Sequence, residues 1–159
     1  RPPTAITERS SAVSDAYKIL VLTVDLDNGE WRVAHYPLET AETGWIGLSE
    51  IVAHEDQLYF VERDNGIGDV ARVKQVTRVA LSDLDRSVPP GETPPVLRKE
   101  LVVDLLPHLR GTGGYVLDKV EGLAVADDGS FWVVTDNDGV DDHSGETRLL
   151  RVRRCRTRT

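Results

Sequence analysis

The chain has 159 residues and a formal net charge of −8, and its length indicates a single domain. Six of its 19 basic residues lie within the last twelve positions, so the other 147 residues carry 27 acids against 13 bases. A body this acidic is a poor partner for nucleic acid, because phosphate contacts need clustered Lys and Arg. No apolar run approaches the roughly 18 residues of a membrane-spanning helix, and no charged-then-apolar signal sequence opens the chain. The single cysteine, Cys155, excludes an intramolecular disulfide framework.

The apolar residues come in short runs rich in Val, Ile, Tyr, Trp and Thr, which is typical of β-strands. In chain order, strands are expected at 17–26, 31–36, 58–62, 73–81, 101–105, 122–126, 131–135 and 148–152. Hairpin turns are expected at 27–29 and 127–129, because Asp, Asn and Gly tolerate a positive φ. The best helical segment, 82–86, is only about a turn long and is soon followed by two prolines. The sequence therefore predicts an all-β fold.

An internal repeat with an offset of 73 residues relates two strand pairs. This offset places residues 58–61 over 131–134 and residues 76–79 over 149–152, with no gap between the two matches. A partial third copy is expected upstream, ending near residue 26. Since two strands and their connection keep one register, we interpret the chain as repeats of one structural unit.

The repeating unit is predicted to be a four-stranded antiparallel meander, which is the blade of a β-propeller. Residues 12–36 are expected to supply the outer half of one blade, 46–105 a whole blade, 118–152 the inner three strands of another, and 153–159 a basic tail. A closed propeller needs about four to eight blades. We therefore expect a partial propeller of about two to three blades, completed by further blades of a longer chain or by self-association into a ring. A two-sheet sandwich is the alternative.

Acidic side chains gather at one end of the hairpin around residues 127–129. Symmetric pairing about this turn would set Glu121 opposite Asp136, where like charges are destabilising unless a cation, a shared proton or a basic side chain offsets them. The acidic and amide residues that follow closely are Asn137, Asp138, Asp141, Asp142 and Glu146. Oxygen ligands at this density suit Ca²⁺, which takes about six to eight of them. An exposed acidic loop that binds no metal explains the same pattern.

The equivalent end of the middle unit carries charges of both signs. Pairing across the turn at 55–56 would place Ser49 opposite Glu62 and Leu48 near Arg63. The charged residues that gather there are Glu50, Glu62, Arg63 and Asp64. In one interpretation Arg63 faces an anionic substrate beside cations held by the acids, and in the other these groups form a structural ion-pair network. The innermost strands of a propeller would bring both acidic ends to one rim, and Trp45 could cover a seam between blades.

Five separated segments, in order, resemble the phytase-like propeller family that is often labelled "esterase-like activity of phytase". They are GWIGLSEI at 44–51, VERD at 61–64, KVEGLA at 119–124, DNDG at 136–139 and ETRLL at 146–150. The resemblance spans roughly residues 19–152. It implies a β-propeller common in exported bacterial proteins, hence a periplasmic or secreted location, with phosphoester or ester hydrolase activity.

The matching motifs imply roles for individual residues. The implied catalytic residues are Glu62, Arg63 and Lys119, the substrate-binding residues are Arg63, Asp64 and Lys119, and the metal ligands are Glu50, Glu121, Asp136, Asn137 and Asp138. We expect a Ca²⁺-assisted hydrolase of a small phosphoester, in which the cation activates water and polarises the phosphoryl group. Arg63 and Lys119 would hold the phosphate. The alternatives are a non-catalytic binding or scaffold propeller with a structural cation, and a lactonase-like hydrolase.

Overall fold

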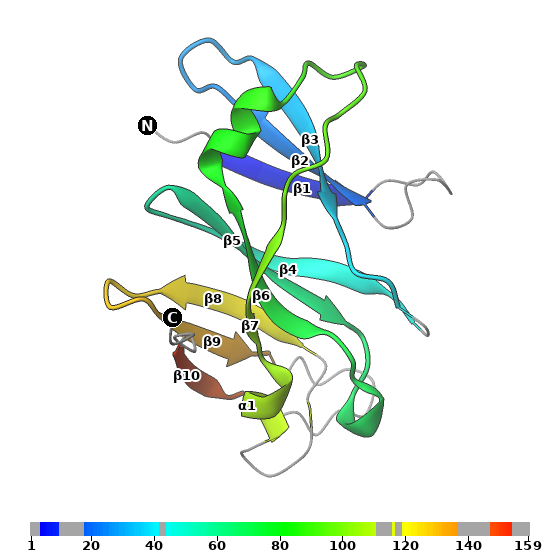
Figure 1. The fold of residues 1–159 in the computed structure, drawn as a ribbon, viewed down its shortest axis with the longest axis vertical. Helices are drawn as coiled ribbons and strands as arrows, with labels where there is room; N and C mark the ends of the chain where they lie inside the picture. Colours follow the sequence, from blue (N-terminus) through cyan, green and yellow to red (C-terminus); the bar gives the residue numbers. More distant parts are fainter. Residues whose placement is uncertain are drawn as a thin grey trace, which may run out of the picture.

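The computed structural model describes residues 4–9, 18–41, 44–110, 116, 119–136 and 147–153. The strands form three antiparallel sheets in the orders β1-β2-β3, β4-β5-β6-β7 and β8-β9-β10 (Figure 1). We call these sheets the N-terminal, middle and C-terminal blades. Each is a meander in which strands consecutive in the chain are neighbours in the sheet. The predictions of an all-β fold and of a partial propeller built from antiparallel blades are confirmed.

The N-terminal blade consists of β1 (Thr4–Arg9), β2 (Lys18–Val24) and β3 (Trp31–Pro37). Residues of β2 alternate between buried and half-buried positions, as expected for a strand with one face on a core. Its turn to β3 ends at Gly29, whose φ of 75° favours glycine. The strand β1 was not predicted, so this blade has one strand more than the sequence indicated.

The middle blade consists of β4 (Ile46–His54), β5 (Gln57–Asp64), β6 (Lys74–Ala80) and β7 (Glu100–Asp104). Three short helices flank its strands: η2 (Gly68–Val70), η3 (Leu81–Arg86) and α1 (Leu106–Arg110). The helical turn expected at 82–86 is therefore present as a 3₁₀ helix. Among the described residues, no helix is long and apolar enough to cross a membrane.

The C-terminal blade consists of β8 (Val120–Val125), β9 (Ser130–Thr135) and β10 (Leu149–Arg153). Its pairing repeats that of the middle blade with the offset seen in the sequence. Leu58 pairs with Val79 in the middle blade, and Phe131 pairs with Val152 in the C-terminal blade. The internal repeat is thus confirmed at the level of strand register.

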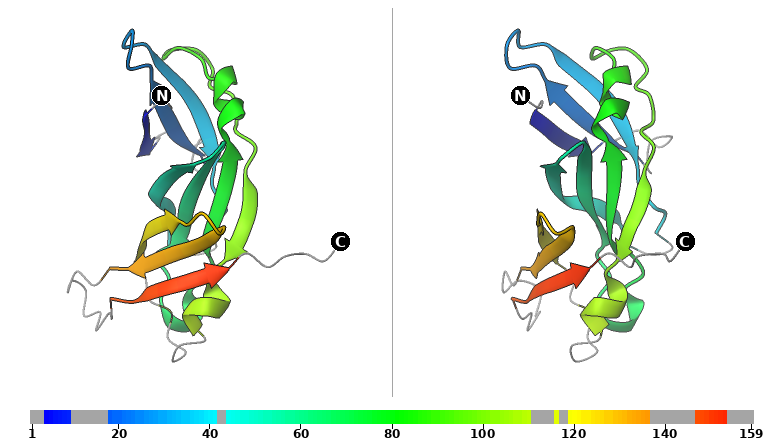
Figure 2. Two further views of the ribbon diagram at one scale, coloured as in Figure 1. Left: turned by 90° about the vertical axis from the view of Figure 1, so that its left-hand side faces the viewer. Right: turned by 60° about the vertical axis from the view of Figure 1, so that its left-hand side comes forward.

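The central strand β5 is buried on both faces because the middle blade lies between the other two (Figure 2). Since successive strand residues point to opposite faces, Phe60 joins the core shared with the N-terminal blade and Tyr59 joins the core shared with the C-terminal blade. The Phe60 ring lies 4.6 Å from that of Tyr36, and the Tyr59 ring lies 5.4 Å from that of Phe131. This face-to-face packing brings charged residues at the end of β5 into both interfaces.

Candidate functional site

The innermost strands of the middle and C-terminal blades, β4 and β8, meet at a seam that contains two β-bulges. The register of β4 shifts between Leu48 and Glu50, which leaves Ser49 as the extra residue. The register of β8 shifts in the same way at Glu121. A bulge re-aims the side chain of the extra residue. Here the Ser49 hydroxyl donates a hydrogen bond of 2.6 Å to the carbonyl of Val120, which links the two blades.

Arg63 forms the centre of a group of side chains at this seam. Its Nη2 donates to Oε1 of Glu121 at 3.0 Å, and its guanidinium lies 5.2 Å from the centre of the Trp45 ring. The Arg63 side chain is only 7% exposed, whereas that of Glu121 is 39% exposed. We call Trp45, Ser49, Arg63 and Glu121 the seam cluster. It joins a buried cation to a carboxylate that solvent can reach.

The predicted pairing of Glu121 opposite Asp136 is wrong. The residues on either side of Glu121 pair with Thr135 and Val134, so Glu121 occupies the bulge and points to Arg63. Asp136 instead stands beside Lys119, whose carbonyl accepts its amide hydrogen at 2.8 Å. Thr135 is buried and Asp136 is exposed, as expected if they lie on opposite faces of the sheet.

Two local features shift this hairpin away from symmetric pairing. The amide of Ala126 donates to the carbonyl of Ser130, so the turn encloses the three residues 127–129. The bulge at Glu121 then shifts the register again. In this register nothing brings the two carboxylates face to face, so the repulsion that was expected to require a cation does not arise from this pair.

The predicted pairing in the middle blade is also wrong by one residue. Leu48 pairs with Glu62 and Gly47 pairs with Arg63, while Ser49 falls in the bulge. The turn at 55–56 is as expected, because His54 pairs with Gln57 across it. The error therefore comes from the bulge alone.

Glu62 is fully buried and lies on the face of β5 that packs against the N-terminal blade. Its Oε2 accepts hydrogen bonds of 3.0 Å from Tyr36, Gln75 and Lys99, and its Oε1 accepts one of 2.6 Å from the amide of Glu39. Burial, and then the negative charge of Glu62, raise the pKa of the Tyr36 hydroxyl. The hydrogen-bonding capacity of this carboxylate is thus used within the protein.

Glu62 and Arg63, both expected to be catalytic, serve different interfaces. Glu62 contacts Tyr36 of the N-terminal blade, and Arg63 contacts Glu121 of the C-terminal blade. Adjacent strand residues point to opposite faces. The two side chains therefore lie in different interfaces, and their catalytic roles stay predictions.

Asp64 fastens the loop that connects β5 to β6. Its carboxylate accepts hydrogen bonds from the amides of Gly66, Arg72 and Val73 and forms an ion pair of 2.9 Å with the fully buried Lys74. Burial alone would raise the pKa of Asp64, but the amides of Arg72 and Val73 and the ammonium of Lys74 lower it below its ordinary value. The contacts of Asp64 are those of a structural anchor, and its substrate-binding role stays a prediction.

The remaining candidate ligands are only partly described. Glu50 accepts a hydrogen bond of 2.8 Å from the amide of Ile51. Asn137 and Asp138 lie outside the described residues, as do the acids further along that loop. Within the described part of the chain, no group of three or more His, Cys, Asp or Glu side chains could hold a metal ion. The Ca²⁺ site thus remains a prediction.

Sequence reasoning missed the residues that neutralise Glu62 and Asp64. Lys99 lies 37 positions from Glu62, and Lys74 lies 10 positions from Asp64. Lys74 sits within a predicted strand, where alternation does not distinguish a buried lysine from an exposed one. Only the three-dimensional fold places these ammonium groups beside their carboxylates.

Comparison with known proteins finds a match to a family. A family model described as "Phytase-like: Esterase-like activity of phytase" matches residues 4–139, a span that runs from β1 through β9 and includes the whole seam cluster. No curated protein and no solved structure matches the chain. Because the model covers most of the sequence, the chain belongs to the phytase-like family.

Proposed function

We propose that this chain is an esterase-like hydrolase module for a small phosphoester, and that the seam cluster binds the anionic group of that substrate. The observation that carries the proposal is the Arg63 guanidinium, held between Trp45 and Glu121 where the innermost strands of two blades meet. A guanidinium presents parallel N–H donors that match two phosphate oxygens. Membership of the phytase-like family supports the ester hydrolase class.

Glu121 is the described carboxylate best placed to act as a general base. It is 39% exposed, so water can reach it, whereas Glu62 is fully buried and already hydrogen-bonded. An anionic substrate would compete with Glu121 for Arg63. The displaced carboxylate could then accept a proton from the water that attacks phosphorus, while the bond from phosphorus to the ester oxygen breaks and the departing alkoxide takes up a proton from solvent. Lys119 lies next to β8 and would supply a second positive charge to the phosphate.

Calcium assistance is part of the same proposal. A bound Ca²⁺ would supply a Lewis acid for the phosphoryl group. Of its proposed ligands, Glu50, Glu121 and Asp136 are described, and in this part of the structure they do not form a metal centre by themselves. Binding would therefore depend on Asn137 and Asp138. Calorimetric titration with Ca²⁺ tests this, because unchanged affinity in Asp138→Asn would contradict it.

Hydrolysis of p-nitrophenyl phosphate and p-nitrophenyl acetate, with and without Ca²⁺, tests the proposed activity. Glu121→Gln should lower kcat for both esters by about 100-fold or more, since general base catalysis is typically worth that much. Arg63→Lys keeps the charge but loses the planar donors, so it should raise KM for the phosphate more than for the acetate.

The matched control is Glu100→Gln. This variant removes an exposed Arg–Glu ion pair of 2.6 Å with Arg78 on the outer strands of the middle blade, away from the seam, and should leave both rates unchanged. If the folded chain hydrolyses neither ester with Ca²⁺ present, the proposed activity is wrong.

The carboxylates of Glu62 and Asp64 make their hydrogen bonds and ion pairs within the protein. This favours a second candidate, a non-catalytic propeller stabilised by internal ion pairs and a structural cation. In that case Ca²⁺ should raise the Tm without any turnover of either ester. Thermal unfolding in Ca²⁺ and in a chelator, run beside the hydrolysis assay, distinguishes the two functions.

A further inference from the structure

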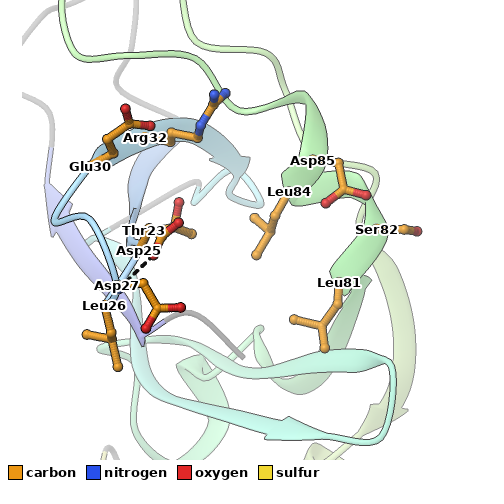
Figure 3. Close-up of a pocket in the computed structure, with 10 residues that line it drawn as sticks. All are labelled: Thr23, Asp25, Leu26, Asp27, Glu30, Arg32, Leu81, Ser82, Leu84 and Asp85. Carbon is orange, nitrogen blue, oxygen red and sulfur yellow. Dashed lines mark hydrogen bonds between the residues drawn. The ribbon is translucent and has the colours of Figure 1, made fainter. Parts of the chain in front are cut away.

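A pocket outside the seam cluster lies between the β2–β3 turn and helix η3 (Figure 3). Its volume is about 770 Å³, which is within the range of small-molecule sites. The N-terminal blade supplies one wall and the middle blade the other. The pocket therefore lies between these two blades.

Two leucines of η3 form an apolar part of the pocket wall. Leu84 is only 7% exposed and belongs to the core shared by the N-terminal and middle blades, and Leu81 packs against the same core. Both side chains project from η3 into the pocket (Figure 3). Since they rest on a packed core, they offer a fixed surface to an aliphatic group.

The rim of the pocket is acidic. Asp25, Asp27 and Glu30 line it from the β2–β3 turn, and Asp85 lines it from η3. Arg32 is the basic residue of the lining, and its Nη1 donates to the carbonyl of Ser87 at 2.8 Å. Among the described residues, none of the four carboxylates forms an ion pair. The pocket thus presents more negative than positive charge to a ligand.

The carboxylates are spread around the rim. The turn is ordered internally, because Asp25 accepts the amide hydrogen of Asp27 at 2.8 Å and Asn28 accepts that of Glu30. In the described part of the chain, no group of acids is close enough to hold a metal ion. A metal ion needs several oxygen ligands at one point, whereas the single charge of an organic cation needs fewer, so this rim suits the organic cation better.

Thr23 gives an independent indication of a ligand. It lines the pocket although it is only 7% exposed, and it lies on the inward face of β2 with Ile19 and Val21. No hydrogen bond of its hydroxyl to another residue is seen in the described structure. Its oxygen is not among the described side-chain atoms that are shut off from solvent without a partner, so the hydroxyl is reached from the pocket and can accept an N–H from a molecule there.

We propose that this pocket binds an organic cation with an aliphatic stem, either a free alkylammonium or the Lys or Arg side chain of a peptide. The charged head lies near Asp25 and the Thr23 hydroxyl, and Asp85 on the opposite wall adds to the negative charge that attracts it. The stem lies on Leu81 and Leu84, as long cationic side chains commonly do on apolar surfaces. This site is separate from the proposed hydrolase site and does not depend on it.

Calorimetric titration of the full 159-residue chain with n-hexylammonium and with a short lysine-containing peptide tests the proposal. Hexylammonium should bind more tightly than methylammonium, and neutral 1-hexanol should not bind. The double variant D25N/D85N should weaken binding at least tenfold, since it removes both negative charges while keeping the size of the side chains. D69N removes an exposed acid on η2 and is the matched control, which should bind as the wild type does.

Thr23→Val keeps the side-chain shape, so it tests the hydroxyl without a large change in packing, and it should weaken binding several-fold. Circular dichroism confirms that each variant is folded. Binding of either cation that is lost in D25N/D85N and kept in D69N supports the proposal, and the tighter of the two identifies the source. Equal affinity in D25N/D85N and wild type, or equal binding of 1-hexanol, overturns it.

Discussion

Three consecutive charged residues, Glu62, Arg63 and Asp64, are all buried at the end of β5. Burying a charge is costly unless it is paired and hydrogen-bonded. Each of the three is paired with a different part of the molecule: Glu62 with the N-terminal blade, Arg63 with the C-terminal blade, and Asp64 with its own loop. The VERD segment that suggested a catalytic motif therefore also links the middle blade to both neighbouring blades.

Replacing Lys99 with Met should lower the free energy of unfolding by about 3–5 kcal/mol, because it leaves Glu62 buried without its cation. Lys99 also pairs with the half-exposed Glu39. Glu39→Gln is thus the matched control, and should cost less than about 1 kcal/mol. Urea unfolding measures both values. Equal losses in the two variants would contradict a special role for the buried pair.

The lowered pKa of Asp64 predicts a loss of stability in acid. A carboxyl group whose pKa is lower in the folded state stabilises the protein above its ordinary pKa of 3.8, and this contribution is lost as the pH falls through the lower folded value. Asp83, whose pKa is lowered chiefly by a hydrogen bond from Arg98, contributes in the same direction. Urea unfolding from pH 7 to below pH 4 should therefore show decreasing stability, with a shallower decrease in Asp64→Asn. An unchanged pH dependence in that variant would show that Asp64 is not one of the groups responsible.

At the scale of elements, the strands could be predicted from the sequence but their register at the seam could not. Runs of β-branched residues and the offset of 73 residues indicate β2, β3 and β5 to β10 correctly, because both reflect burial within a repeated blade. A bulge depends on how two strands meet in space, and neither Ser49 nor Glu121 carries a local signal for one. The sequence could thus indicate Arg63 and Glu121 as site residues, but not that they contact each other.

The strand β1 was missed for a related reason. Its six residues, TAITER, are a short and largely polar segment without the apolar run that marked the other strands. It forms by pairing along β2, where Ile6 stands opposite Leu22. This strand therefore forms because its backbone pairs with that of β2, and not because its own sequence has a strand-like apolar pattern.

The β8 bulge is followed by a glycine whose replacement tests the register. A Cβ at Gly122 would overlap Cγ1 of Val134, its partner on β9. Gly122→Ala should therefore lower stability by about 1–3 kcal/mol through overpacking. The double variant Gly122→Ala/Val134→Ala should recover part of that loss, which a double-mutant cycle by urea unfolding measures. Additive losses would mean that these two residues are not opposite each other.

At the scale of the whole molecule, β5 couples the blades because alternate residues of this one strand enter two cores. Phe60 packs on Tyr36 in the core with the N-terminal blade, and Tyr59 packs on Phe131 in the core with the C-terminal blade. The seam adds the Arg63–Glu121 ion pair on one side. A loss of packing on one face of β5 should therefore also lower the stability of the blade that packs on the other face.

Two tryptophans can report this coupling, since Trp31 lies on β3 and Trp132 lies on β9. In a Trp45→Phe background, chains that keep only Trp31 or only Trp132 should show coincident urea transitions, the behaviour of a single cooperative unit. Adding Phe60→Ala should shift both transitions equally, by about 3–5 kcal/mol, although Phe60 packs on the N-terminal side. Leu101→Ala, at a residue that is 60% exposed on the edge strand β7, should shift neither. If Phe60→Ala moved only the Trp31 transition, the blades would unfold independently, and a substrate bound at the seam could not stabilise the N-terminal blade.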